Sequence, residues 1–129
     1  MLGHPVTHPE TVATAIRIGN PASTALAVAA KDESGGLFEA VTDDQILAAQ
    51  QFLATREGIF VEPGSATGVA GLLARHERGQ VDPGQQIVIT VTGHGLKDID
   101  TALSVTGPLE AEVVPAELSA VAQACELDG

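Results

Sequence analysis

The strongest constraint on the fold comes from residues 86–92, whose sequence QIVITVT carries isoleucine, valine and threonine in an almost unbroken run. Branching at Cβ favours extended backbone in such a run. Because residues 87–91 are apolar on both faces, the segment is typical of a strand inside a parallel sheet that helices cover. Residues 37–41 and 59–61 are two shorter predicted strands. The order of strands and helices predicts an α/β fold with a mostly parallel sheet flanked by helices.

Helices are predicted around these strands from the residues that begin and end them. Thr42 is followed three residues later by Gln45, which is the pattern of a capping box. Gly58 is expected to end this helix, since glycine is common just past helix ends. Ser65 is predicted to cap a helix that continues to about Arg78. Further helices are predicted over residues 10–18, 22–30 and 115–127.

The composition excludes several classes of function. Lys and Arg total 6 against 17 Asp and Glu, so the net charge of −11 leaves no basic face for nucleic acid or an anionic membrane. The first residues lack the features of a signal peptide, and no apolar run reaches the roughly 20 residues of a membrane span. The single cysteine, Cys125, excludes an internal disulfide and indicates a reducing, cytoplasmic setting.

The length of 129 residues suits one domain or part of one. We expect residues 1–129 to form a single partial domain, in which residues 108–129 are a tail with a terminal helix.

Two segments are candidates for ligand binding because each follows a predicted strand at its carboxyl end, where parallel sheets bind ligands. Residues 92–98 contain two glycines that allow close approach of a ligand, and a threonine hydroxyl at Thr92. Residues 62–67 precede a helix amino end, which suits a polar or anionic group. Taken singly, the first segment is also typical of a plain turn, and the second of a strand-to-helix turn with a serine cap.

A metal site is not predicted. His4 and His8 have the spacing of two ligands on a helix, but Pro5 and Pro9 disfavour that helix. No cysteine or third ligand lies near them. The sequence also carries no phosphate-loop, dinucleotide or GxSxG motif.

Three runs of sequence, taken together, are far more specific than any one of these patterns. They are TVATAIRIGNPAS (11–23), GIFVEPGSATGVAGL (58–72) and VTGHGLKDIDTA (91–102). In order and separation they resemble the carboxyl-terminal part of threonine synthase, with the actinobacterial type the most similar. The resemblance implies the large domain of a fold-type II enzyme dependent on pyridoxal 5'-phosphate (PLP), of the tryptophan synthase β type.

The resemblance also implies roles for particular residues. Thr92 would hydrogen-bond the pyridine nitrogen of PLP, with Gly93 beside it. The turn containing Gly19 and Asn20 would run beside the cofactor ring, and Glu62 would lie near the ring edge. These five residues are the predicted cofactor-binding set.

No catalytic residue is predicted in this chain. The family binds PLP as a Schiff base with a lysine in a Ser-Phe-Lys-Asp-like run near its amino end, and holds the cofactor phosphate in a glycine-rich loop. Lys31 and Lys97 are the only lysines here, and neither lies in such a context. The glycine-rich loop is also missing from the sequence.

The implied function is the conversion of O-phosphohomoserine and water to L-threonine and phosphate. This chain would be a carboxyl-terminal piece of that enzyme, from a split, truncated or degenerate gene, and inactive alone. An amino-terminal threonine synthase chain or further copies of this chain would be its partners. A non-catalytic module that associates with itself or with a partner is a second reading. A serine or threonine dehydratase fragment is a third, although the run from Thr92 to Asp98 fits threonine synthase better.

Overall fold

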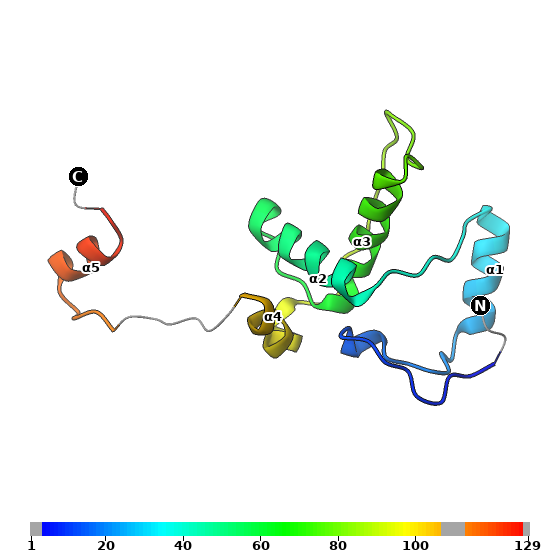
Figure 1. Cartoon of the computed structure of the whole chain (residues 1–129), viewed down its shortest axis with the longest axis horizontal. Helices are drawn as coiled ribbons and strands as arrows, with labels where there is room; N and C mark the ends of the chain where they lie inside the picture. Colours follow the sequence, from blue (N-terminus) through cyan, green and yellow to red (C-terminus); the bar gives the residue numbers. More distant parts are fainter. Residues whose placement is uncertain (1–3, 107–112, 128–129) are drawn as a thin grey trace.

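The computed structural model describes residues 4–106 and 113–127. Its α-helices are α1 (Thr24–Ser34), α2 (Asp43–Phe52), α3 (Pro63–Glu77), α4 (Ile99–Thr106) and α5 (Leu118–Ala124), as Figure 1 shows. Single turns of 3₁₀-helix cover Thr14–Ile16 and Gly95–Asp98, and a π-helical turn, Leu53–Glu57, extends α2. No described helix has the length and apolar character that a membrane crossing needs.

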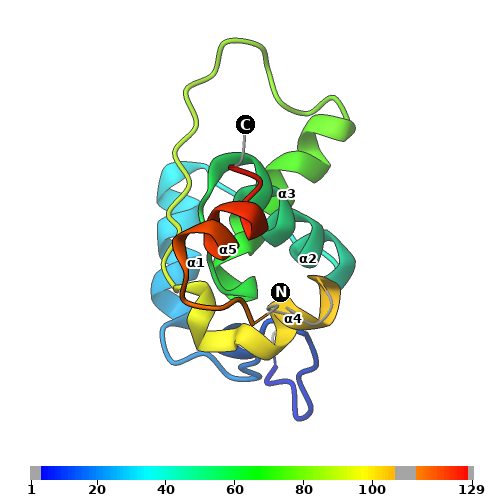
Figure 2. The same cartoon turned by 90° about the vertical axis from the view of Figure 1, so that its left-hand side faces the viewer.

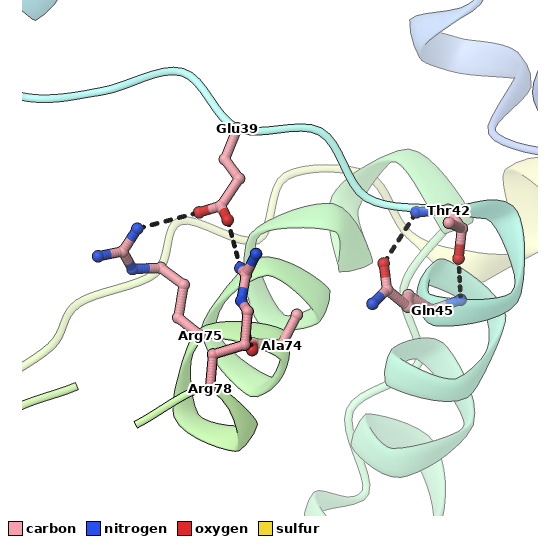
Figure 3. A network of polar contacts seen from close by, with 6 residues as sticks. All are labelled: Glu39, Thr42, Gln45, Ala74, Arg75 and Arg78. Atoms are coloured by element: carbon pink, nitrogen blue, oxygen red, sulfur yellow. Dashed lines mark hydrogen bonds and ion pairs between the residues drawn. The ribbon is translucent and has the colours of Figure 1, made fainter. Parts of the chain in front are cut away.

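Helix α2 begins as predicted. The Thr42 hydroxyl accepts from the Gln45 amide at 3.3 Å, and the Gln45 side chain accepts from the Thr42 amide at 2.9 Å (Figure 3). These reciprocal bonds form the capping box and satisfy two amides at the start of the helix. Gly58, at φ 67°, ends the π-helical turn that continues α2.

We expect Thr42→Ala to lower the free energy of unfolding by about 1 kcal/mol, because the Gln45 amide loses its acceptor. Urea unfolding followed by circular dichroism measures this loss. Thr55→Ala is the matched control, since Thr55 is exposed and its hydroxyl only bonds back to the Gln51 carbonyl. Equal stability of the Thr42→Ala variant and the unmodified chain would contradict the role given to the cap.

Helix α3 begins earlier than predicted and without a serine cap. Glu62 is the residue before its first turn, and Pro63 occupies the first turn, where a missing amide proton costs no hydrogen bond. Ser65 therefore lies inside the helix, and the prediction that it caps the helix is wrong. Its hydroxyl is used elsewhere, as the acceptor for the Thr92 amide.

The core lies between α2 and α3, which pack side by side at the centre of the molecule (Figures 1 and 2). Small residues allow this close approach: Ala49 and Ala66 have no exposed surface. The remaining members of the buried cluster are Leu53, Val61, Val69 and Ala70. Ile89 packs against this cluster from residues 86–92, and a Cβ at Gly68 would lie only 2.9 Å from its Cγ2.

Ion pairs connect Glu39, in the segment before α2, to two arginines at the end of α3. Arg75 donates to Glu39 at 3.2 Å, and Arg78 donates to the other oxygen of the same carboxylate (Figure 3). The hydrogen bond from Arg78, aided by that from Arg75, lowers the pKa of Glu39 from its ordinary value. A carboxyl whose pKa is lowered in the folded state adds stability above its unfolded pKa and loses it as the pH falls.

The predicted strands are not strands within the described residues. Residues 37–41 and 86–92 are extended but pair with no neighbour, and residues 59–61 contribute only one isolated antiparallel bridge, Val61 with His94. A strand needs a second strand to take up its amides and carbonyls. No second strand pairs with residues 86–91 in the described part of the chain. Their β-branched sequence is therefore typical of a strand, but the hydrogen-bond ladder of a sheet does not form.

The outer helices also differ from prediction. Residues 10–18 form only the 3₁₀ turn Thr14–Ile16, and α1 begins at Thr24, two residues later than expected. Helix α4 was not predicted, and α5 is shorter than the 115–127 expected. Figure 1 shows α5 apart from α2 and α3. The proposed tail over residues 108–129 lies partly outside the described residues.

Candidate functional site

The two candidate ligand-binding segments lie side by side at the amino end of α3. The Glu62 amide donates to the Gly93 carbonyl at 2.9 Å, and the Gly95 amide donates to the Phe60 carbonyl at 3.1 Å. These two bonds enclose the bridge between Val61 and His94. The carboxyl ends of two predicted strands are therefore joined through their backbones.

Gly93 lies directly against the side chain of Glu62. A Cβ built on Gly93 would lie 2.0 Å from the carboxylate carbon of Glu62, which is closer than any two atoms can pack. Gly93 does not have a positive φ, so this position requires glycine for space and not for backbone conformation. The missing side chain lets the Glu62 carboxylate lie over the backbone at Gly93.

Ser65 fixes the backbone at Thr92. Its Oγ accepts from the Thr92 amide at 2.6 Å, and Ser65 itself is only 5% exposed. The side chain of Thr92 is exposed, and within the described residues its hydroxyl has no hydrogen-bond partner. Thr92 therefore has a positioned backbone and a hydroxyl that is free to bind a ligand.

Gln50, on α2, contacts the backbone next to the site. It is 3% exposed, and its Nε2 donates to the Val61 carbonyl at 2.8 Å. Val61 directly precedes Glu62, so this bond from α2 fixes the chain just before the site. Sequence patterns gave no indication of Gln50, because a glutamine in an amphipathic helix is ordinarily exposed.

An aromatic contact lies beside the site. The rings of Phe60 and His94 meet edge to face with centroids 5.8 Å apart. His94 Nδ1 accepts from the Leu96 amide at 3.1 Å and so begins the 3₁₀ turn that follows. A Cβ on Gly95 would lie 2.5 Å from the Phe60 ring, so both glycines of the Gly-His-Gly run allow close contacts.

The turn that contains Gly19 and Asn20 is fixed differently. The Gly19 carbonyl accepts from the Val6 amide at 2.9 Å, and Asn20 is exposed. No hydrogen bond in the described residues joins Gly19 or Asn20 to Glu62, Thr92 or Gly93. The structure thus brings three of the five predicted residues together and leaves the other two in a separate turn.

That turn is nonetheless anchored near the site. Ile16 lies three residues before Gly19 in the sequence. Its Cγ2 atom is 3.4 Å from the Cβ position of Gly64, and the Glu62 carboxylate is 3.9 Å from the same position. The carboxylate of Asp43 accepts from the Thr11 hydroxyl at 2.6 Å and from the Val12 amide at 3.1 Å. The segment leading to the turn is therefore held at the amino ends of both α2 and α3.

The side chains of the two lysines form no hydrogen bond or ion pair with Glu62, Thr92 or Gly93 in the described residues. Lys31, on α1, forms an ion pair with its neighbour Asp32. Lys97 is exposed in the 3₁₀ turn Gly95–Asp98. Within the described part of the chain, no group of three His, Cys, Asp or Glu side chains could hold a metal ion.

The sequence profile described as "Pyridoxal-phosphate dependent enzyme" matches residues 2–93. The chain belongs to this family. The PLP-dependent family that the resemblance implied is thereby confirmed. The family's members use PLP, and the fold-type II assignment agrees with the match, while the parallel sheet has no counterpart among the described residues.

Three relatives of this chain are each named threonine synthase. The chain is 57% identical over 103 residues to the threonine synthase of Mycobacterium leprae (strain TN), which is 80% of this chain and 29% of the relative. It is 54% identical over 99 residues to that of Methanocaldococcus jannaschii, covering 77% of the chain and 24% of the relative. It is 49% identical over 122 residues to that of Synechocystis, covering 95% and 31%. The chain spans less than a third of the length of these relatives.

The residues present fit one part of a PLP site. An exposed hydroxyl without a partner at Thr92 is the type of group that binds a neutral ring nitrogen, and Gly93 offers bare backbone next to it. Neither Lys31 nor Lys97 lies within the cluster formed by Glu62, Thr92 and Gly93.

Proposed function

We propose that this chain supplies the carboxyl-terminal part of the PLP site of a threonine synthase, which converts O-phosphohomoserine and water to L-threonine and phosphate. The observation that carries the proposal is the free Thr92 hydroxyl, positioned through Ser65 beside the Glu62–Gly93 contact. Identities of 49–57% to threonine synthases support the choice of reaction.

Each site residue has a role in this proposal. Thr92 donates its hydroxyl to the pyridine nitrogen and so leaves that nitrogen largely without a proton. Gly93 allows close approach of the ring, and Glu62 lies at the ring edge. Gly19 and Asn20 line the ring from the turn that follows the 3₁₀ helix. When bound, PLP supplies an electron sink for reactions of amino acids.

The covalent lysine and the phosphate-binding loop come from the amino-terminal part of the enzyme in this proposal, which the 129 residues do not cover. Residues 1–129 then form a single partial domain, and residues 86–92 join a mostly parallel sheet when the amino-terminal part is present. The extended, unpaired backbone of residues 86–91 supports this view, as does the 93% exposure of Val88. The setting of the enzyme is the cytoplasm, where its amino-acid substrate would be made.

The surface of the chain supports a role for a partner. Its accessible surface is 9745 Å², whereas a compact monomer of 13.1 kDa exposes about 6400 Å². Large apolar side chains contribute to this surface, including Leu26, Leu37 and Leu96. Sedimentation velocity distinguishes the two partners: a stable homo-oligomer of the chain alone favours the self-associating module, and a monomer that binds an amino-terminal threonine synthase segment favours the proposal.

The reaction is tested by mixing the chain with the amino-terminal remainder of the Mycobacterium leprae threonine synthase, the part that this chain does not match. We expect threonine and phosphate from O-phosphohomoserine only when both pieces are present. Release of ammonia from serine or threonine, without use of O-phosphohomoserine, would favour a dehydratase. No turnover of any of these substrates by the mixture would contradict the proposal.

We expect Thr92→Val to weaken PLP binding by the mixed enzyme by about 1–3 kcal/mol, because the ring nitrogen loses its hydrogen-bond donor. Titration of the cofactor's visible absorbance measures the change in affinity and any shift of the band. Thr90→Val is the matched control, since Thr90 is also exposed and lies in the same extended segment. An unchanged spectrum and affinity in the Thr92→Val variant would contradict the role of this hydroxyl.

A further inference from the structure

Asp98 links two segments that lie far apart in the sequence. Its Oδ2 accepts from the hydroxyl of Thr14 at 3.0 Å, across a separation of 84 residues. Its Oδ1 accepts from the hydroxyl of Thr101, on the first turn of α4, at 2.7 Å. One carboxylate thus bonds a local hydroxyl with one oxygen and a distant hydroxyl with the other.

Both ends of the long-range bond lie close to candidate cofactor-binding residues. Thr14 begins the 3₁₀ turn Thr14–Ile16, and Arg17 and Ile18 lead from it to the turn with Gly19 and Asn20. Asp98 ends the 3₁₀ turn that follows Thr92 and Gly93. The bond between Thr14 and Asp98 is therefore a side-chain tie between the two parts of the site that share no hydrogen bond of their own.

Other contacts hold the amino-terminal segment on different elements. Asp43 ties Thr11 and Val12 to α2, and Arg17 donates to the Thr11 carbonyl. These bonds fix the segment relative to α2 but not relative to Thr92. The bond from Thr14 to Asp98 joins this segment to the turn that follows Gly93, and it acts together with the packing of Ile16 beside Gly64 at the start of α3.

We propose that Asp98 is a positioning residue, which sets the spacing between these two turns so that both can contact one cofactor ring. The inference rests on the proposed function of the site. A carboxylate suits this role because it has two oxygens, and each accepts a separate hydroxyl without competition from the other. Asp98 acts through Thr14 and need not touch the cofactor itself.

The test uses three variants. Thr14→Val removes the long-range bond, Thr14→Ser keeps the hydroxyl, and Thr101→Val removes only the local bond to the same carboxylate. In the chain alone, amide hydrogen exchange of residues 14–20 is measured. In the mixture with the amino-terminal segment, PLP affinity and the absorption band of the bound cofactor are measured.

We expect Thr14→Val to speed exchange of residues 14–20 and to weaken PLP binding by up to about five-fold, because an exposed hydrogen bond to a charged group contributes at most about a factor of this size. Thr14→Ser restores both values, and Thr101→Val leaves PLP affinity within two-fold of the unmodified chain, roughly the limit for a surface change.

The experiment distinguishes failure of the Asp98 inference from failure of the proposed function. Unchanged PLP affinity in Thr14→Val, or no recovery in Thr14→Ser, overturns the role of Asp98 while the proposed function stands. A mixture of unmodified chain and amino-terminal segment that binds no PLP overturns the proposed function and this inference together.

Discussion

Replacement of Gln50 by glutamate is expected to lower the free energy of unfolding by up to about 4 kcal/mol at pH 7. The Nε2 group that donates to the buried Val61 carbonyl becomes an oxygen, which can donate only when it carries a proton. Protonating a carboxyl of ordinary pKa about 4.3 at pH 7 costs about 2.7 pH units at roughly 1.4 kcal/mol each. Remaining ionised would instead place a charge beside a carbonyl in a position that is 3% exposed.

The loss caused by Gln50→Glu depends on pH in a defined direction. Burial and the neighbouring carbonyl raise the pKa of the introduced carboxyl in the folded state above its unfolded value. Stability close to that of the unmodified chain is therefore expected below about pH 4, and it is lost as the pH rises toward 7. Urea unfolding of both chains at each pH measures the difference, by circular dichroism because the chain has no Trp or Tyr.

Gln51→Glu is the matched control for this experiment. It makes the same change of charge at the next residue of α2, whose side chain is exposed. We expect its stability to stay within about 0.5 kcal/mol of the unmodified chain. Equal effects of Gln50→Glu and Gln51→Glu would show that the bond to Val61 contributes nothing and that only the added charge matters.

Gly93→Ala is expected to weaken PLP binding by the mixed enzyme by roughly 5- to 150-fold. The new methyl group would occupy the space of the Glu62 carboxylate, 2.0 Å from its carbon. Crowding of this kind costs about 1–3 kcal/mol, and the displaced Glu62 can no longer lie at the ring edge. Because the end of a glutamate side chain can swing away, we expect the unfolding free energy to fall far less than cofactor affinity.

Gly71→Ala is the matched control for this substitution, because no atom lies within 4 Å of the Cβ position at Gly71 in α3. It should bind PLP normally and be as stable as the unmodified chain or slightly more so. A second variant, Glu62→Ala combined with Gly93→Ala, tests the route of the effect. If Glu62 carries the loss, the double variant binds no more weakly than Glu62→Ala alone. Normal affinity in Gly93→Ala would contradict the close contact.

Local features of this chain could be predicted from its sequence. The capping box at Thr42 and Gln45 forms as expected, because all its atoms lie within four residues. Gly58 and Gly79 follow helix ends with positive φ, which glycine adopts without strain. The family could be recognised because three runs in fixed order are far more specific than any one motif.

Features that depend on distant residues could not be predicted. Residues 86–92 have the composition of a buried strand, but a ladder also needs a second strand, and none pairs with them in the described residues. Ser65 has the type and place of a cap, yet Pro63 begins the helix and the hydroxyl serves Thr92, 27 residues away. The bond from Gln50 to Val61 likewise depends on how α2 packs on α3.

The central claim is that residues 1–129 contribute Thr92 and its neighbours to a PLP site whose covalent lysine lies in the amino-terminal part of the enzyme, outside these residues. Its most direct test is borohydride reduction in the presence of PLP, followed by mass mapping of the labelled lysine. The experiment compares the chain alone with the chain mixed with the amino-terminal threonine synthase segment. We predict no specific label on Lys31 or Lys97 in either sample, and one labelled lysine on the amino-terminal segment in the mixture. Stoichiometric labelling of Lys31 or Lys97 in the chain alone, or no label anywhere in the mixture, would contradict the claim.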